Sequence, residues 1–240
     1  MRQLQFEDLG KMRYKPCWNY QEEVFKSVIA RKIARRDTIS DEGKADLPLP
    51  VSHLLFVEHP HVLTLGRSGN AENVIVSPER LAELGVDYFP INRGGDITYH
   101  GPGQLVAYPI LDLDQFFTDI HKYLRYLEEG VIRTCADFGV VAGRIDGQTG
   151  VWVDIEAGNG ARKICAFGVK CSRWVTMHGL AFNVDSDLNF FDLIIPCGIS
   201  DKGVTSLSKE VGRTISLEEV KPRLKQHLQD LFQWDEINVS

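Results

Sequence analysis

The sequence predicts an α+β protein with a mixed, mostly antiparallel sheet flanked by helices. Three observations support this class: strand-like runs gather in the middle of the chain, helical segments lie far apart around them, and no segment repeats. Strands clustered between widely separated helices are typical of α+β architecture. Because no shift in composition marks a boundary, we expect residues 1–240 to form one domain.

Four segments carry the signals of helices. We expect them at residues 16–36, 77–85, about 118–138, and from 216 onwards. The first is amphipathic, with apolar side chains recurring near one face. The second has Ser77 as its N-cap, Pro78 at the first helical position and Gly85 at its end. The fourth opens with Ser216 and Glu219, spaced as in a capping box.

Strand-like runs are rich in β-branched and apolar residues. The run that begins at His53 should be a strand interrupted at Pro60. Further strands are expected at GVWVDI (150–155), KICAFGV (163–169) and HGLAFNV (178–184). The polar segment 37–50 has the composition of a loop, and residues 93–110 are expected to form a loop or a hairpin between strands.

Composition limits the classes of partner. The chain has 240 residues and a net charge of −6, which argues against a nucleic-acid binder that relies on bulk positive charge. No apolar run is long enough for a membrane span, and the N-terminus has no apolar signal-peptide core. Five cysteines without an export signal do not suggest a disulfide framework. We therefore expect a cytoplasmic protein with no membrane partner.

The segment RGGDITYHGPGQLVAYPI, residues 93–110, combines flexible backbone with polar side chains. Gly94, Gly95, Gly101 and Gly103 allow tight turns and let a ligand approach the backbone closely. The spacing fits neither a Walker loop nor a dinucleotide-binding turn. From the residues alone, a ligand site and a ligand-free glycine-rich turn both remain open.

A lysine and a cysteine suggest a second site. A thiol becomes a better nucleophile when a nearby ammonium lowers its pKa, and Lys163 and Cys197 could form such a pair. Their spacing does not establish contact, so a buried structural cysteine and a surface lysine remain the alternative. Cys165, Cys171 and His178 do not have a recognised zinc spacing, and we expect them to pack rather than bind metal.

Four segments in order resemble the lipoyl(octanoyl) transferase family. They are RGGDITYHGPGQL (93–105), KICAFGVK (163–170), WVTMHGLAFNV (174–184) and IPCGI (195–199). The similarity runs from Leu63 to about Ser206, and the long glycine-rich motif is highly specific. The resemblance implies a domain related to the catalytic modules of biotin and lipoate protein ligases. Residues 37–50 are longer than the connection that is usual in that family.

The resemblance also implies the reaction and its residues. An octanoyl group would pass from octanoyl-acyl carrier protein to a lysine of lipoyl domains through an acyl-thioester on Cys197, with Lys163 as the activating residue and no cofactor. The acceptors would be lipoyl domains of 2-oxoacid dehydrogenase complexes and the glycine cleavage H protein. The acyl site would be lined by Arg93, Gly94, Gly95, Asp96, Ile97, Thr98, Tyr99, His100, Ala166, Phe167, Gly168, Gly179, Leu180 and Ala181.

Several questions stay open at this stage. The side chains of residues 93–100 could contact substrate or brace the loop, and either Lys163 or the departing thiolate could take the proton in the second transfer. An ATP-dependent ligase or a non-catalytic acyl-binding protein on the same fold are alternative functions. Acidic partners would need local cations near the site, and the candidates are Arg67, Lys170, Arg173 and Lys202.

Overall fold

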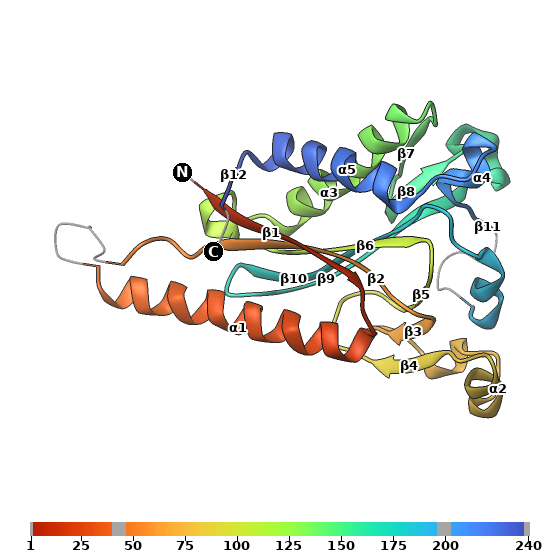
Figure 1. Ribbon diagram of the computed structural model, residues 1–240, viewed down its shortest axis with the longest axis horizontal. Helices are drawn as coiled ribbons and strands as arrows, with labels where there is room; N and C mark the ends of the chain where they lie inside the picture. The colour runs from red at the N-terminus through yellow and green to blue at the C-terminus, as the bar shows by residue number, and fades with distance from the viewer. Residues whose placement is uncertain (1, 40–46, 196–202, 238–240) are drawn as a thin grey trace.

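The computed structural model describes residues 2–39, 47–195 and 203–237, and Figure 1 shows their arrangement. A large sheet runs through the molecule. In spatial order its strands are β12 (Asp235–Glu236), β1 (Gln3–Lys11), β2 (Ser52–Glu58), β6 (Gln104–Ile110), β10 (Val175–Asn183), β9 (Arg162–Ser172), β8 (Gln148–Val153) and β7 (Ala142–Ile145), with β11 (Gly203–Val204) also paired to β9. β1 pairs in parallel with β2 and β12, and β11 pairs in parallel with β9. The other pairings along this path are antiparallel, so the predicted mixed, mostly antiparallel sheet is confirmed.

A smaller sheet lies beside the large one. Its order is β4 (Asp87–Pro90), β3 (Val62–Leu65) and β5 (Ile97–His100). The run predicted from His53 does break at Pro60, and its halves, β2 and β3, join different sheets.

Of the two alternatives for residues 93–110, a loop or a hairpin between strands, the hairpin is wrong. β5 pairs with β3, whereas β6 pairs with β2 and β10, so the two strands leave the turn in different sheets. The turn is held by other segments: the Gly103 N–H donates to Glu58 Oε1 at 2.9 Å. The Gly103 carbonyl accepts from Asp185 N at 2.8 Å. These bonds replace the cross-strand bonds that a hairpin would require.

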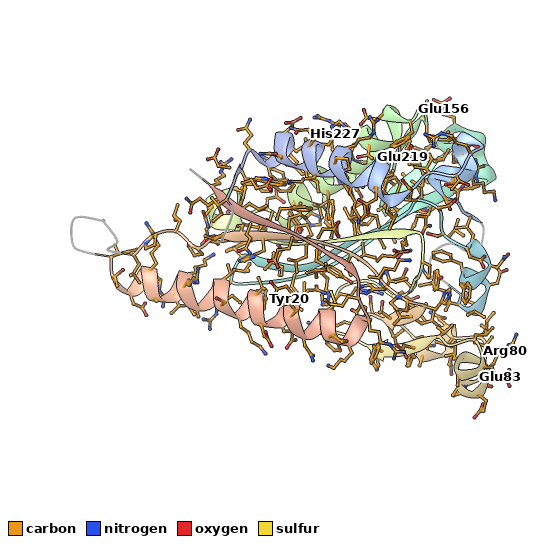
Figure 2. The ribbon with its side chains drawn as sticks, in the orientation of Figure 1. Tyr20, Arg80, Glu83, Glu156, Glu219 and His227 are labelled. Atoms are coloured by element: carbon orange, nitrogen blue, oxygen red, sulfur yellow. The ribbon has the colours of Figure 1, made fainter. Side chains whose placement is uncertain are left out.

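The four helices predicted from sequence signals are present, and a fifth, short helix at Leu207–Val211 was not predicted. The helices are α1 (Tyr14–Asp37), α2 (Pro78–Glu83), α3 (Ile120–Asp137), α4 (Leu207–Val211) and α5 (Leu217–Phe232), with short 3₁₀ turns η1 (Ala71–Asn73), η2 (Leu113–Gln115), η3 (Ile155–Gly160) and η4 (Leu188–Leu193). The Ser77 side chain caps α2, and the predicted capping box of Ser216 and Glu219 is present. Figure 2 shows Glu219 and His227 along α5. No helix in the described part of the chain has the length and apolar character needed to cross a membrane.

Helices cover both faces of the large sheet (Figure 1). α3 and α5 lie on one face, and α1 lies on the other. β2 illustrates why both faces are buried: Leu54 and Phe56 belong to the core under α3 and α5, whereas Leu55 and Val57 belong to the core under α1. Alternate residues of a strand point to opposite faces, so this strand supplies both cores.

Candidate functional site

A cavity of about 220 Å³ lies where the large sheet meets β5 and η4. Apolar and polar side chains share its wall. The lining residues are Tyr14, Arg93, Gly95, Asp96, Ile97, Thr98, His100, Val106, Tyr108, Thr149, Lys163, Ala166, Phe167, Gly168, His178, Gly179, Leu180, Ala181, Phe191, Ile194 and Val204. This volume is slightly below the roughly 300–1,000 Å³ of drug-sized ligand sites, so it suits a small ligand.

Most of the described residues expected at the site lie on this wall, and two do not. Gly94 and Tyr99 are not among the lining residues. Tyr99 is buried with its ring stacked 5.3 Å from that of Phe190. Its side chain therefore belongs to a core rather than to the cavity. Cys197 lies outside the described residues.

The sequence interpretation missed eight lining residues. They are Tyr14, Val106, Tyr108, Thr149, His178, Phe191, Ile194 and Val204. Val106 and Tyr108 are two positions apart on β6 and therefore face the same side of the sheet. The alternation of side chains along β6 can be read from the sequence. The sequence does not show which of the two faces of β6 meets the cavity.

The glycines around the cavity make room for a buried arginine. A Cβ on Gly168 would lie 2.7 Å from Arg93 Cδ, and a Cβ on Gly66 would lie 2.9 Å from Arg93 Nη1. Gly95 has φ +84°, a left-handed backbone that favours glycine. Gly94 donates its N–H to Val169 O at 2.9 Å. These glycines thus have structural reasons for being glycine, apart from any ligand.

Arg93 braces the glycine-rich loop from inside. Its Nη2 donates to Thr64 O at 2.8 Å and to Thr64 Oγ1 at 3.0 Å. Its Nη1 donates to Gly94 O at 3.0 Å. Only 7% of the residue is exposed, and burial lowers the pKa of its guanidinium. Arg93 therefore connects the 93–95 turn to β3 through uncharged partners.

Three histidines in and behind the wall are held neutral. Burial lowers the pKa of His59 to about 4. Burial, together with the nearby His59, lowers the pKa of His100 to about 3. Burial and the Arg93 charge lower that of His178 to about 3. Because all three stay uncharged near neutral pH, they add hydrogen-bonding groups to the site without adding charge.

Two of these histidines have fixed partners. His59 Nε2 bonds Tyr108 Oη at 2.8 Å, and His100 Nδ1 bonds Gln104 Oε1 at 2.8 Å. His178 has a longer bond, from Nε2 to Asn92 Oδ1 at 3.4 Å. Its φ of +61° is unusual for a non-glycine residue. Among the described residues, its buried Nδ1 has no hydrogen-bond partner. Most hydrogen-bonding groups of these histidines thus have partners within the protein.

Lys163 brings an amine to the cavity without an acidic partner. It lies on β9, and no described side chain forms a hydrogen bond or ion pair with its Nζ, which sits 4.6 Å from the centre of the Trp152 ring. Burial lowers the pKa of Lys163 to about 8. The amine is therefore able to hold or release a proton near neutral pH, which suits acid and base chemistry.

None of the described cysteines is an activated thiol. Cys17, Cys135 and Cys165 are buried, and Cys171 is exposed. Burial raises the pKa of Cys17 and of Cys135 to about 12. Burial also raises the pKa values of Cys165 and Cys171. A nucleophilic thiolate is therefore not expected at any of these four positions.

The described residues also contain no metal site. No group of three or more His, Cys, Asp or Glu side chains within residues 2–39, 47–195 and 203–237 could hold an ion. Cys165 and Cys171 are six residues apart on one strand, about 20 Å at the usual rise. The expected packing role is confirmed for Cys165, which is in the core, and wrong for Cys171, which is exposed at the end of β9.

The described candidates for docking cations lie in different segments. Arg173 lies just past the end of β9 that is opposite to Lys163, about 30 Å from Lys163 along the strand. Lys170 Nζ lies 5.0 Å from the centre of the Phe25 ring. Arg67 is exposed beyond β3, and Lys202 is outside the described residues.

Sequence comparisons identify close relatives. The model of the lipoyl protein ligase A/B catalytic domain matches residues 13–229. A protein of Cytophaga hutchinsonii named octanoyltransferase is 57% identical over 227 residues, which cover 95% of this chain and 91% of that protein. The octanoyltransferase of Flavobacterium johnsoniae is 54% identical and covers 97% of both chains.

Solved structures share the fold at low sequence identity. The putative lipoate protein ligase Ta0514 from Thermoplasma acidophilum, with bound lipoic acid, has a TM-score of 0.69 and 17% identity, over 100% of this chain and 90% of that chain. A lipoate-protein ligase A bound with ATP has a TM-score of 0.64 and 17% identity, over 99% and 89%. These likenesses support the predicted architecture alone.

Proposed function

The chain belongs to the lipoyl protein ligase A/B catalytic domain family, and from this premise we propose the steps of its reaction. Its activity is octanoyl transfer in protein lipoylation, so it is an acyltransferase. In our proposal, octanoyl-acyl carrier protein donates the group, Cys197 carries it as a thioester, and a lysine of a lipoyl domain receives it. The acceptors would be lipoyl domains of 2-oxoacid dehydrogenase complexes and the glycine cleavage H protein.

The main support for the proposal is that Lys163 lines the same cavity as Ile194 and Val204, which flank the segment that contains Cys197. Val204 is the register partner of Lys163 in the β9–β11 pairing. Cys197 is three positions after Ile194 in the chain, a reach of at most about 11 Å. This proximity supports a thiol and an amine acting at one cavity, and the four described thiols offer no alternative nucleophile.

The first transfer exchanges one thioester for another. The Cys197 thiolate attacks the octanoyl carbonyl, the C–S bond to the carrier's phosphopantetheine breaks, and the carrier leaves as a thiolate that takes up a proton. The Lys163 ammonium favours the thiolate form of Cys197 electrostatically. Because one thioester replaces another of similar energy, the step needs no nucleotide.

The second transfer makes an amide. The neutral acceptor amine attacks the Cys197 thioester, the C–S bond breaks, and one proton must leave the nitrogen. A free lysine with a pKa near 10.4 is almost wholly protonated at pH 7, so a base is needed. Because burial lowers the pKa of Lys163 to about 8, its neutral amine is available for this role, which supports Lys163 over the departing thiolate.

We assign the acyl chain to the apolar part of the wall. Phe167, Leu180 and Ile97 contribute side chains there, with Ala166 and Ala181 beside them. An alkyl chain makes no hydrogen bonds, so apolar walls and glycine backbone suit it. Gly168 and Gly179 leave the wall open, although each also has a close neighbour that a Cβ would strike. Arg93 and Tyr99 support the loop in this proposal rather than contacting the acyl chain.

The location follows from thiol chemistry. Cys17, Cys135, Cys165 and Cys171 are free in the described structure, and free thiols persist in reducing compartments. We place the reaction in the cytoplasm on this basis.

The deciding experiment mixes octanoyl-acyl carrier protein, the enzyme and a purified lipoyl domain without ATP. We expect octanoylated lipoyl domain and, without acceptor, an octanoyl adduct on Cys197 detected by mass spectrometry. Cys197→Ala should lose both, while the matched control Cys171→Ala, which removes an exposed thiol, should keep both. Strict dependence on ATP would instead indicate a ligase, and an adduct on another cysteine would refute the assignment of Cys197.

A further inference from the structure

Trp152 lies against Lys163, the lysine to which we assign the proton transfers. Its ring centre lies 4.6 Å from Lys163 Nζ, and the residue is 1% exposed on β8. We propose that Trp152 is a positioning residue whose indole face carries the Lys163 ammonium into the cavity in place of a carboxylate. This inference rests on the proposed role of Lys163 and adds the group that sets its place and its charge.

An irregularity in the strand pairing brings the two side chains together. Val151 pairs with Cys165, so regular antiparallel register would place Trp152 opposite Ile164. The register shifts there, and Trp152 pairs with Lys163 instead. An extra residue in one strand redirects the side chains beside it, and such bulges are frequent next to active sites. Lys163 therefore faces the cavity because of this bulge.

Gly150 provides the space for this contact. A Cβ at Gly150 would lie 3.0 Å from Trp152 Nε1 and 3.1 Å from Lys163 Cε. Its φ of +149° also favours glycine. The Gly150 N–H donates to Glu128 Oε1 at 3.1 Å, and buried Glu128 is held by Arg144 at 3.0 Å. The backbone beside the indole is thus fixed by a buried ion pair.

The face of an indole ring and a carboxylate group have different effects on the pKa of a nearby amine. A carboxylate beside Lys163 would raise its pKa, and the amine would be a poor base. The negative face of the ring attracts the ammonium more weakly than a carboxylate does. It therefore offsets only part of the decrease in pKa that burial causes, and the amine can still release its proton near neutral pH. With Trp152 beside it, Lys163 has a protonated fraction that favours the Cys197 thiolate and a neutral fraction that can accept a proton.

The chain contains a solvent-exposed counterpart for comparison. Lys15 Nζ lies 4.2 Å from the centre of the Trp18 ring, but Lys15 is exposed on α1. Water screens that contact, whereas Lys163 is partly buried. Lys15 therefore provides an internal reference in any measurement that changes all tryptophans together.

The test measures the pH dependence of amine labelling, which does not require Cys197. Reductive methylation of Lys163, quantified by peptide mass spectrometry, reports the fraction of free amine. In Trp152→Leu the midpoint should fall by about one pH unit. Octanoyl loading at pH 7 should then fall about twofold, because the protonated fraction of Lys163 falls from about nine-tenths to about one-half. Trp152→Phe keeps a ring face and should restore most of both values.

Because Trp152→Leu could unfold, a second measurement keeps the shape of the side chain. Biosynthetic replacement of tryptophan by 5-fluorotryptophan weakens the negative ring face, and it should lower the Lys163 midpoint while leaving that of Lys15 nearly unchanged. An unmoved Lys163 midpoint in the fluorinated protein, or an equal shift in Trp152→Phe and Trp152→Leu, would overturn the inference. Intact octanoyl loading in Lys163→Met would instead contradict the proposed function itself.

Discussion

Replacing Lys163 by methionine should make the protein more stable while it removes activity. The buried amine has its pKa lowered to about 8 from 10.5, which means that the folded state disfavours the ammonium. Methionine has a similar length and no charge, so it removes this cost and keeps apolar contacts in the wall. An active-site residue that destabilises the fold is expected where function requires a buried charge.

The size of the effect follows from the pKa. A difference of 2.5 between 10.5 and about 8 corresponds to about 3 kcal/mol. The folded-state pKa of Lys163 already includes the attraction to the Trp152 ring, so about 3 kcal/mol is the net cost that methionine removes. For a chain of this size, that raises the melting temperature by about 6–12 °C.

The sign depends on pH. Below about pH 8 both the folded and the unfolded chains carry the proton on Lys163, so the full cost is present. Between pH 8 and 10.5 only the unfolded chain binds the proton, so the stability of the native protein rises with pH. The advantage of Lys163→Met should therefore be largest at pH 7 and should disappear above about pH 10.5.

Urea denaturation of the native protein and of Lys163→Met at pH 7 and pH 10.5 measures this difference. Lys15→Met is the matched control, because Lys15 also lies over a tryptophan ring but is exposed, and its stability should not change with the substitution. A Lys163→Met variant that is no more stable than the native protein at pH 7 would refute the argument from burial.

Two further predictions concern the walls of the cavity. Acidification should unfold the protein, because three histidines with lowered pKa values must be protonated on unfolding: His59, His100 and His178. Stability should fall as pH decreases from 6.5 toward 4 by up to about 4 kcal/mol per pH unit, and a circular-dichroism titration that reports uptake of fewer than one proton would contradict this. Gly168→Ala, whose Cβ would crowd the buried arginine at 2.7 Å, should reduce octanoyl loading more than Gly95→Ala does. Urea titrations should show losses of about 1–3 kcal/mol for each variant, and equal loading by both would contradict a role for Gly168 in shaping the site.

Local signals predicted the helices better than the strand partners. α2 and α5 carry their own caps at Ser77 and Ser216, so their starts can be identified without tertiary context. The first strand, β1, was not predicted, although it pairs with β2 in the large sheet. The separation of β5 from β6 was also missed, because it depends on bonds from Gly103 to residues far away in sequence. Sequence periodicity indicates the type of an element but not its neighbour.

The site shows the same limit. The family motifs identified Lys163 and most of the cavity wall, because those residues lie within a few continuous segments. Tyr14 reaches the wall from α1, 79 residues before Arg93 in the chain, and only packing brings it there. Trp152 meets Lys163 through a shift in strand register. Neither contact has a local signal, since register is set by the whole sheet.

The two cations of the cavity explain why only one of them is suited to chemistry. Arg93 and Lys163 are both on the wall, and burial lowers the pKa of each. The Arg93 guanidinium donates to carbonyl and hydroxyl oxygens of the surrounding backbone and side chains, and a guanidinium does not release its proton in proteins. It can hold a loop but cannot serve as a base. Lys163 has an aromatic face beside it and no hydrogen-bond partner among the described residues, so its proton is free to move. Both groups carry one positive charge when protonated, so their chemistry and their partners, and not their charge, separate the structural cation from the reactive one.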